Sequence, residues 1–358
     1  MASIKRQPSG RWQARYRDDA GREHAQRFAR KVDAQRWLDE AAASLVTGQY
    51  VDPRAGRMTV REYAAMWQSR QVWRPKTAKR VETDLRVHIL PVFGDRPLSS
   101  VRRSDMQALV KQLATVLAPS SVKVTFSTPR GLFKAAVEDR LITASPCAGV
   151  KLPTVAPKAL LIPSVETVRT IGSTLPGRYA AVVYVAAGLG LRPGEVFGLR
   201  VADVDFLRRV VSVRWQLDDH GAMVDLKTTA SYRTIPLPDV VGVELARHLA
   251  AYPSTGLVFT GNAGQPVKRN TFSKTWRRRA TTAGVPDLTL HDLRHVYASA
   301  LIAAGESVKV VQKRMGHSSA AMTLDVYSHL WPDSDDRSRT IIDAFLGFPA
   351  DTVRTVEA

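Results

Sequence analysis

Cysteine is nearly absent from the chain, because Cys147 is the only one in 358 residues. A single thiol excludes an internal disulfide and any zinc site made of several cysteines. Long apolar runs are also missing. The longest, Tyr179–Leu191, is too short to span a bilayer, so we expect a buried helix there. The first residues lack the apolar core of a signal peptide, and we therefore expect a cytoplasmic protein with no membrane partner.

Acidic residues are scarce relative to basic ones. The chain has 52 Lys+Arg against 33 Asp+Glu, a formal net charge of +19, and residues 58–153 carry the densest positive charge. Such an excess favours a polyanionic partner, and double-stranded DNA is the first candidate. A genome rich in arginine codons would give the same excess without any partner. The length allows two or three domains.

Residues 1–50 are predicted to form a small α+β module. Arg11–Arg17 alternates apolar with polar residues as a strand does, Glu23–Arg30 could return as a second strand, and Val32–Leu45 has helical periodicity. Arginines on the exposed face of this sheet could enter a DNA groove, or they could merely be solvated. The candidates are Arg15, Arg17, Arg27 and Arg30.

Residues 58–150 are predicted to form a basic helical domain, between linkers at 48–58 and 151–164 that are rich in glycine or proline. Four helices are expected, over Val60–Gln68, Thr77–Ile89, Ser104–Leu117 and Val122–Glu138. A basic bundle of this kind can neutralise the phosphates of a duplex. The candidate DNA contacts are Arg74, Lys76, Lys79, Arg80, Lys123 and Arg130.

Residues 160–350 are predicted to form the largest domain, mostly helical with a small antiparallel sheet. The strands are expected over Val210–Leu217, Ala222–Lys227 and Arg233–Leu237. The fold class of the whole chain is therefore mainly α with small antiparallel sheets, that is, α+β.

Two arginines of this domain fall where helices are expected to begin. Pro193 suits a first helical turn, which places Arg192 at a helix N-terminus. Thr289 is a plausible N-cap, so that His291 and Arg294 would share one face near the start of the next helix. Helix N-termini attract anions, and an arginine with an imidazole there can form a phosphate site.

Five short motifs bring these residues together in sequence order. They are AGLGLRPGE at 187–195, LKTT at 226–229, HDLRH at 291–295, MGHSS at 315–319 and TLDVYSH at 323–329. The set resembles the tyrosine recombinase family of the phage integrase type, over roughly residues 60–345. The six positions that the resemblance marks as catalytic are all filled: Arg192, Lys227, His291, Arg294, His317 and Tyr327.

The resemblance implies covalent catalysis without a cofactor or metal. Tyr327 would attack a DNA phosphodiester and form a 3′-phosphotyrosyl intermediate. Lys227 would protonate the leaving 5′ oxygen, and His291 would be the base that assists Tyr327. The remaining side chains would hold the phosphate: Arg192, Arg294 and His317.

The resemblance also implies partners. These are core-type and arm-type DNA sites, further copies of the chain in a homo-tetramer on DNA, a host DNA-bending protein and a directionality factor, in the cytoplasm of a bacterial host. The element would be a temperate phage or a similar mobile element. An apolar stripe near the C-terminus, at Ile341, Ile342, Ala344, Phe345 and Leu346, could dock on a neighbouring subunit or simply pack within its own domain.

Two alternatives stay open from the residues alone. A metal-dependent transposase or nuclease would need a cluster of metal ligands, mainly carboxylates, and several side chains could contribute to it: Asp203, Asp205, Asp218, Asp219, His220 and Asp292. A DNA-binding protein without catalysis is the second alternative. We expect Glu195 to brace the turn of Arg192, and His295 and His329 to be packing or surface histidines.

Overall fold

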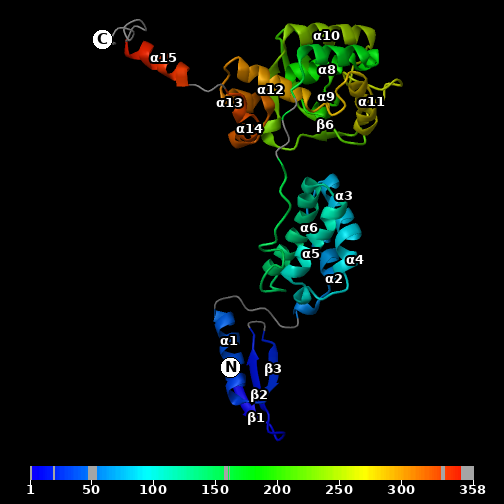
Figure 1. Ribbon diagram of the computed structural model, residues 1–358. Coiled ribbons are helices and arrows are strands. Elements are labelled where there is room, and N and C mark those ends of the chain that lie inside the picture. The colour runs from blue at the N-terminus through cyan, green and yellow to red at the C-terminus, as the bar shows by residue number, and fades with distance from the viewer. Residues whose placement is uncertain are drawn as a thin grey trace. The chain divides into compact units, whose positions relative to one another are not determined.

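The computed structural model describes residues 2–18, 21–46, 55–156, 160, 162–331 and 335–347. The chain divides into two compact units, Met1–Pro157 and Lys158–Ala358. Helices dominate, and the sheets are small and antiparallel (Figure 1), which confirms the expected fold class. None of the described helices has the length and apolarity needed to cross a membrane.

A three-stranded sheet and one helix form the N-terminal module, residues 2–46. Its elements are β1 (Ser3–Arg6), β2 (Trp12–Arg17), β3 (Glu23–Phe28) and α1 (Lys31–Val46), with the sheet order β1-β2-β3. The alternation in β2 directs Ala14 and Tyr16 into a core with Leu38 of α1. Strand β1 was not expected, because its four residues, SIKR, show no clear alternation of apolar and polar side chains.

The expected helical bundle follows, with its own hydrophobic core. Its helices are α2 (Val60–Ser69), α3 (Pro75–Asp84), α4 (Leu90–Phe93), α5 (Arg103–Val116) and α6 (Pro119–Glu138). Helix α2 begins with a capping box, in which Thr59 and Glu62 satisfy each other's backbone N–H groups. The helix expected over Thr77–Ile89 is present, but after Asp84 it continues as a π-helical turn, η2 (Leu85–Ile89).

The second unit is built around the apolar helix α8 (Gly177–Leu189), which confirms the expected buried helix. It packs against α7 (Val165–Thr174) and against α10 (Asp239–Ala251) and α12 (Leu293–Ala303), which Figure 1 shows close to it. The other helices are α9 (Pro193–Phe197), α11 (Arg269–Thr282), α13 (Val308–Met315), α14 (Ala320–Tyr327) and α15 (Asp335–Leu346). Helices α12, α13 and α14 contact one another in sequence order, and Arg294 lies on α12 and Tyr327 on α14.

The strands of this unit form two sheets rather than the single expected one. The first sheet has the order β4 (Val204–Asp205), β5 (Val210–Val213), β8 (Arg233–Pro236), and the second pairs β6 (Trp215–Leu217) with β7 (Met223–Asp225). The expected strand Val210–Leu217 is therefore wrong as one element, since its two halves pair with different partners. Because apolar and polar residues keep alternating through Arg214, the sequence pattern does not reveal this exchange.

Candidate active site

Arg192 lies at the N-terminus of α9, where Glu195 holds both its backbone and its side chain. The Glu195 carboxylate accepts hydrogen bonds from the Arg192 backbone N–H at 3.0 Å and from its guanidinium at 2.8 Å. A second guanidinium nitrogen donates to the Gly316 carbonyl at 3.0 Å. The bracing role expected for Glu195 is confirmed, and the Arg192 side chain remains 31% exposed, within reach of a ligand.

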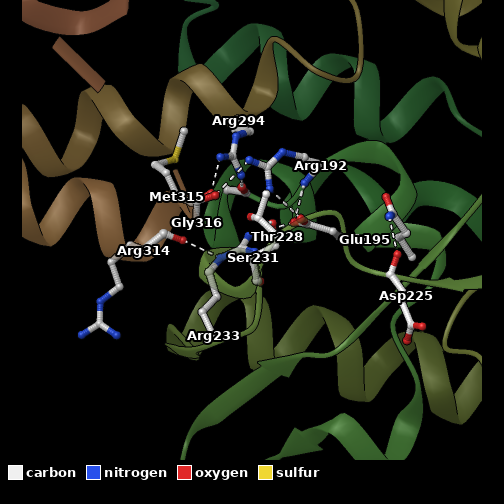
Figure 2. A network of polar contacts seen from close by, with 12 residues as sticks. Arg192, Glu195, Asp225, Thr228, Ser231, Arg233, Arg294, Arg314, Met315 and Gly316 are labelled. Carbon is white, nitrogen blue, oxygen red and sulfur yellow. Dashed lines mark hydrogen bonds and ion pairs between the residues drawn. The ribbon is translucent and has the colours of Figure 1, made fainter. Parts of the chain in front are cut away.

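Arg233, the first residue of β8, is a buried cation that the sequence analysis did not single out. Its guanidinium donates to Glu195 at 2.8 Å and to the Arg314 carbonyl at 2.8 Å (Figure 2). Burial by itself would raise the pKa of Glu195, but the charges of Arg233 and Arg192 outweigh it and lower that pKa to about 2. The only sequence signal was the RTIP segment after Lys227, which does not distinguish a buried arginine from a surface one.

Arg294, in the first turn of α12, is 2% exposed and donates to the carbonyls of Gly190 and Met315. Figure 2 shows it beside Arg192, with both side chains directed at the turn after α13. Burial and the charge of Arg192 lower the pKa of Arg294 to about 9, so that it stays charged at neutral pH. Two planar cations thus converge on one place, an arrangement suited to a phosphate.

Three consecutive carbonyls at the end of α13 each accept a hydrogen bond from a different arginine. Arg233 binds the carbonyl of residue 314, Arg294 that of residue 315 and Arg192 that of residue 316. These arginines come from β8, α12 and the start of α9. We call this turn, residues 314–316, the carbonyl turn, and it joins the separate motifs into one site.

Two glycines permit this convergence. Gly190 ends α8 with φ +60°, and a Cβ there would lie 2.4 Å from the ring of Tyr297. Gly316 ends α13 with φ +63°, and a Cβ there would lie 3.0 Å from a guanidinium nitrogen of Arg233. Only glycine adopts this backbone without strain and leaves room for the neighbouring side chain.

His317 follows the carbonyl turn directly and is 8% exposed. Its Nδ1 lies 2.9 Å from Oγ1 of Thr323, and its ring stacks on Tyr327 at a centroid distance of 6.5 Å. Burial, with the charges of Arg294 and Arg192, lowers the pKa of His317 to about 3. The imidazole is therefore neutral at neutral pH, and if the Thr323 hydroxyl donates to Nδ1, the ring proton is on Nε2.

Tyr327, the last residue of α14, is 1% exposed, and burial raises its pKa to about 12. Its phenolic oxygen lies 2.6 Å from Nδ1 of His295. His295, expected to be a packing or surface histidine, is therefore the histidine that contacts the phenol, and the role of base expected for His291 stays a prediction. The reason is that α12 turns the residue after Arg294 toward α14, a tertiary relation that sequence spacing cannot show.

His291 lies in a turn before α12 and not on the helix. Thr289 does not cap the helix, because its backbone N–H and its hydroxyl both donate to Asp292, at 2.7 and 2.8 Å, and the helix begins at Leu293. The exposed His291 ring meets the His295 ring edge-on at a centroid distance of 5.5 Å. Desolvation by the protein around the ring, and then the charge of Arg294, lower the pKa of His291 below its ordinary value.

Lys227 lies in the loop between β7 and the 3-10 turn η5 (Thr229–Ser231), and its side chain is exposed. The same loop leads into Arg233 at the start of β8, so its far end is anchored in the buried network. The structure therefore joins Arg192, Arg294 and the residues around Tyr327 by contacts, and it places Lys227 on the adjoining surface loop.

The DNA-contact candidates of the N-terminal module lie mainly on one face of its sheet. Arg15 and Arg17 alternate with the buried residues of β2, and Arg27 is exposed on β3, opposite Gln13 in the register. Glu23 lies 3.4 Å from Arg15 on this face. Arg30 does not belong to the set, because β3 ends at Phe28 and Arg30 lies in the bend before α1.

The candidates of the helical bundle lie on α3 and α6, except for Arg74, which is the N-cap residue of α3. Five of them are exposed: Arg74, Lys76, Lys79, Lys123 and Arg130. Arg80 differs from these, because it donates to Asp84 at 2.5 Å and to Thr128 at 3.2 Å. These hydrogen bonds indicate that Arg80 holds α3 against α6 within the bundle.

The carboxylates considered for a metal site are not gathered in one place. Among the residues that the structure describes, no group of three or more His, Cys, Asp or Glu side chains could hold a metal ion. Asp203 pairs with Arg200 at 3.0 Å, and Asp292 accepts from Thr289.

Family models and relatives match this architecture. The phage integrase family matches residues 163–333, the phage integrase N-terminal domain residues 2–47, and the phage integrase N-terminal SAM-like domain residues 59–114. A prophage phiRv2 integrase of Mycobacterium tuberculosis is 28% identical over 344 residues, covering 91% of this chain and 90% of its own. A XerC-like tyrosine recombinase of Caldanaerobacter subterraneus is 27% identical over 260 residues, covering 63% and 66%.

Solved structures show the same fold. The Tn1549 transposon integrase, bound to a circular intermediate DNA, superposes with a TM-score of 0.70 at 22% identity, covering 80% of this chain and 99% of that one. A lambda integrase tetramer bound to a Holliday junction superposes with a TM-score of 0.58 at 17% identity, covering 88% and 96%.

The fold, and the cluster of arginines and histidines around one buried tyrosine, define a tyrosine-type site-specific recombinase. The chain belongs to the phage integrase family.

Proposed function

We propose that this integrase cuts and rejoins DNA through Tyr327, with Arg192 and Arg294 as the phosphate-binding residues. One observation carries the proposal: both arginines converge on the carbonyl turn, which leads directly into His317, whose ring stacks on Tyr327. Their paired guanidinium groups match the geometry of nonbridging phosphate oxygens and stabilise the charge that grows there in the transition state.

In the proposed reaction, the Tyr327 oxygen forms a bond to phosphorus and the bond from phosphorus to the 5′ oxygen breaks. The product is a 3′-phosphotyrosyl DNA and a free 5′-hydroxyl. Lys227, on its exposed loop, donates the proton to the leaving 5′ oxygen, and the neutral His317 donates Nε2–H to the phosphate. A 5′-hydroxyl from another strand then reverses the step without ATP, because the adduct retains the energy of the broken bond.

The catalytic domain is proposed to span residues 160–350, with two further DNA-binding parts before it. The helical domain, 58–150, would grip the core site through the exposed cations of α3 and α6. The N-terminal module, 1–50, would bind arm-type sites with the sheet face that carries Arg15, Arg17 and Arg27. A chain with both parts suits the integration and excision of a temperate phage or a similar mobile element in the cytoplasm of a bacterial host.

The active assembly is proposed to be a homo-tetramer on DNA, as for the lambda integrase bound to a Holliday junction. Helix α15 supports subunit docking, since Ile341, Ile342, Phe345 and Leu346 are each more than half exposed. Deleting the residues after Ser338 should leave DNA binding intact and impair assembly, and unchanged recombination by that truncation would contradict the docking role. A host DNA-bending protein and a directionality factor complete the proposed set of partners.

A covalent-adduct assay tests the reaction. The protein is incubated in EDTA with nicked DNA that carries the region flanking its own gene, alongside Tyr327→Phe. We expect an adduct on denaturing gels that is lost in the variant. Binding without any adduct would favour a DNA-binding protein without catalysis, dependence on added metal would favour a transposase or nuclease, and an adduct in Tyr327→Phe would mean another nucleophile.

A further inference from the structure

We propose that His295 is the base that removes the phenolic proton of Tyr327, and that Asp292 orients it. This inference rests on the proposed function of Tyr327 as the nucleophile. It gives the role of base, which the resemblance assigns to His291, to the histidine that contacts the phenol.

The contact between His295 and the nucleophile is direct. Nδ1 of His295 lies 2.6 Å from the Tyr327 oxygen, which is hydrogen-bond distance, and the two rings meet at 60° with centroids 5.5 Å apart. A general base must lie within hydrogen-bond reach of the proton that it takes. His295 meets this requirement, and it directly follows Arg294 on α12, so one helical turn carries both a phosphate-binding residue and the base.

Asp292 is positioned behind the ring. One carboxylate oxygen accepts from the backbone and the hydroxyl of Thr289. The other lies 3.9 Å from Nε2 of His295, on the far side of the ring from Tyr327. A carboxylate at that distance favours the tautomer with its proton on Nε2, which leaves the Nδ1 lone pair for the phenol, and it stabilises the imidazolium that forms.

Solvent has little access to the phenol in this arrangement. Tyr327 is 1% exposed, so at neutral pH a protein group takes the proton faster than water does. His317 stacks on the tyrosine ring, and its Nδ1 contacts Thr323. His291 meets His295 and is thus one ring further from the phenol.

The proposed step transfers two protons and exchanges one bond at phosphorus. The phenolic proton moves to Nδ1 of His295, the Tyr327 oxygen bonds to phosphorus, and the 5′ oxygen leaves with a proton from Lys227. The groups that influence His295 include Asp292 and His291 before α12, Arg294 on it, and Tyr327 and His317 across from it. When the 5′-hydroxyl attacks the adduct, His295 returns the proton to Tyr327.

His295→Asn tests the base directly, because the asparagine amide occupies the place of Nδ1 but cannot take a proton at neutral pH. Single-turnover adduct formation should fall about 100-fold or more at pH 7. The variant's rate should then rise about tenfold per pH unit toward pH 9, as hydroxide replaces the base, while the wild-type rate changes much less. Asp292→Asn should show a smaller loss, and the exposed His329→Asn, a control outside these contacts, should match the wild type.

A substrate with sulfur in place of the leaving 5′ oxygen separates the base from the acid, since a thiolate leaves without a proton. His295→Asn should stay slow on this substrate, whereas Lys227→Ala should recover. Recovery of His295→Asn would assign His295 to the leaving group and overturn the inference. Faster adduct formation by His295→Asn would also overturn the inference, because the histidine would then hold Tyr327 in an unreactive position.

The experiment separates this inference from the proposed function. A Tyr327-dependent adduct in the wild type, formed at full rate by His295→Asn, would refute the base and leave the nucleophile standing. If the wild type forms no such adduct, both fall together. Thermal unfolding and DNA binding of each variant are measured in parallel. If His295→Asn is unfolded, Asp292→Asn serves as the second test. A slower rate of adduct formation in Asp292→Asn that higher pH does not restore would then overturn the inference.

Discussion

The arginines of the N-terminal sheet and those of the active site are the same residue type in opposite settings. Arg15 and Arg17 extend from β2 into solvent, and the Arg15 side chain is 48% exposed. Arg233 and Arg294 are nearly fully buried, and their donors are directed by carbonyl groups and by Glu195. The first pair can contribute charge to any duplex, whereas the second pair contributes a fixed geometry.

This difference predicts how each set responds to change. An exposed arginine is one of several similar charges, and losing it weakens an electrostatic attraction that salt also weakens. A buried arginine cannot be removed without leaving acceptors unsatisfied, and a lysine cannot replace its planar fork. Four experiments test the comparison.

The largest effect is expected for Arg294→Lys. The ammonium group keeps the charge but cannot bind two carbonyls and a phosphate at once, so adduct formation should fall about 100- to 1000-fold. Single-turnover kinetics on a short core-site duplex measure this. Arg15→Lys is the matched control and should retain the wild-type rate. Equal rates for both variants would remove the distinction between geometry and charge.

Arg233→Met should destabilise the catalytic unit by about 3 kcal/mol or more, because it leaves the buried Glu195 carboxylate without its main partner. Denaturant unfolding measures the change. Arg86→Met disrupts an exposed pair with Glu82, whose side chains are 65% and 52% exposed, and should cost less than about 1 kcal/mol. Similar losses in the two variants would contradict the bracing role of Arg233.

Acid should destabilise the site through His317. Its pKa is lowered to about 3 in the folded state, so only the unfolded chain gains a proton as the pH falls below about 6.5. This contribution is fully present above pH 6.5, and about 2 kcal/mol of it should be lost by pH 5. His317→Asn lacks the group, so its unfolding midpoint should shift less between pH 7 and pH 5. Parallel shifts in the two proteins would refute this assignment.

The smallest single effects are expected on the sheet. Arg15→Ala, Arg17→Ala and Arg27→Ala should each weaken binding to arm-type DNA only several-fold, roughly as expected for one phosphate contact. Each should lower the slope of log affinity against log salt by about one. Arg30→Ala, in the bend outside the sheet, is the control and should leave the slope unchanged. A slope that falls equally for Arg30→Ala would place the DNA elsewhere on the module.

Sequence reasoning located elements and residue types better than it located contacts. The helices around Tyr63 and Val182 have buried apolar faces that periodicity or hydrophobicity reveals. Sequence patterns failed to predict β1, which is too short to show a period. They also failed for the strand Val210–Leu217, whose two halves pair with different strands. Such an exchange depends on pairing across the fold and leaves no mark in local alternation.

The same limit applies to the active site. Arg192, Arg294, His317 and Tyr327 stand in recognisable motifs, and the structure connects them through the carbonyl turn and the stacked ring of His317. His295 stands in the same motif as Arg294, but only the packing of α12 on its neighbours brings its ring to Tyr327. The sequence offered no means of choosing between His291 and His295, because both lie within one turn of Arg294.

The carbonyl turn has a consequence for the enzyme before it meets DNA. The C-terminal end of α13 is the negative end of a helix dipole, and its carbonyls accept hydrogen bonds from Arg192 and Arg294. In the site without DNA, neutral peptide carbonyls thus accept hydrogen bonds from the arginines, as the charged phosphate oxygens of the substrate would. Under the proposed function, an arriving phosphodiester uses the guanidinium donors that the carbonyls leave over, so the backbone holds both arginines in place before DNA is bound.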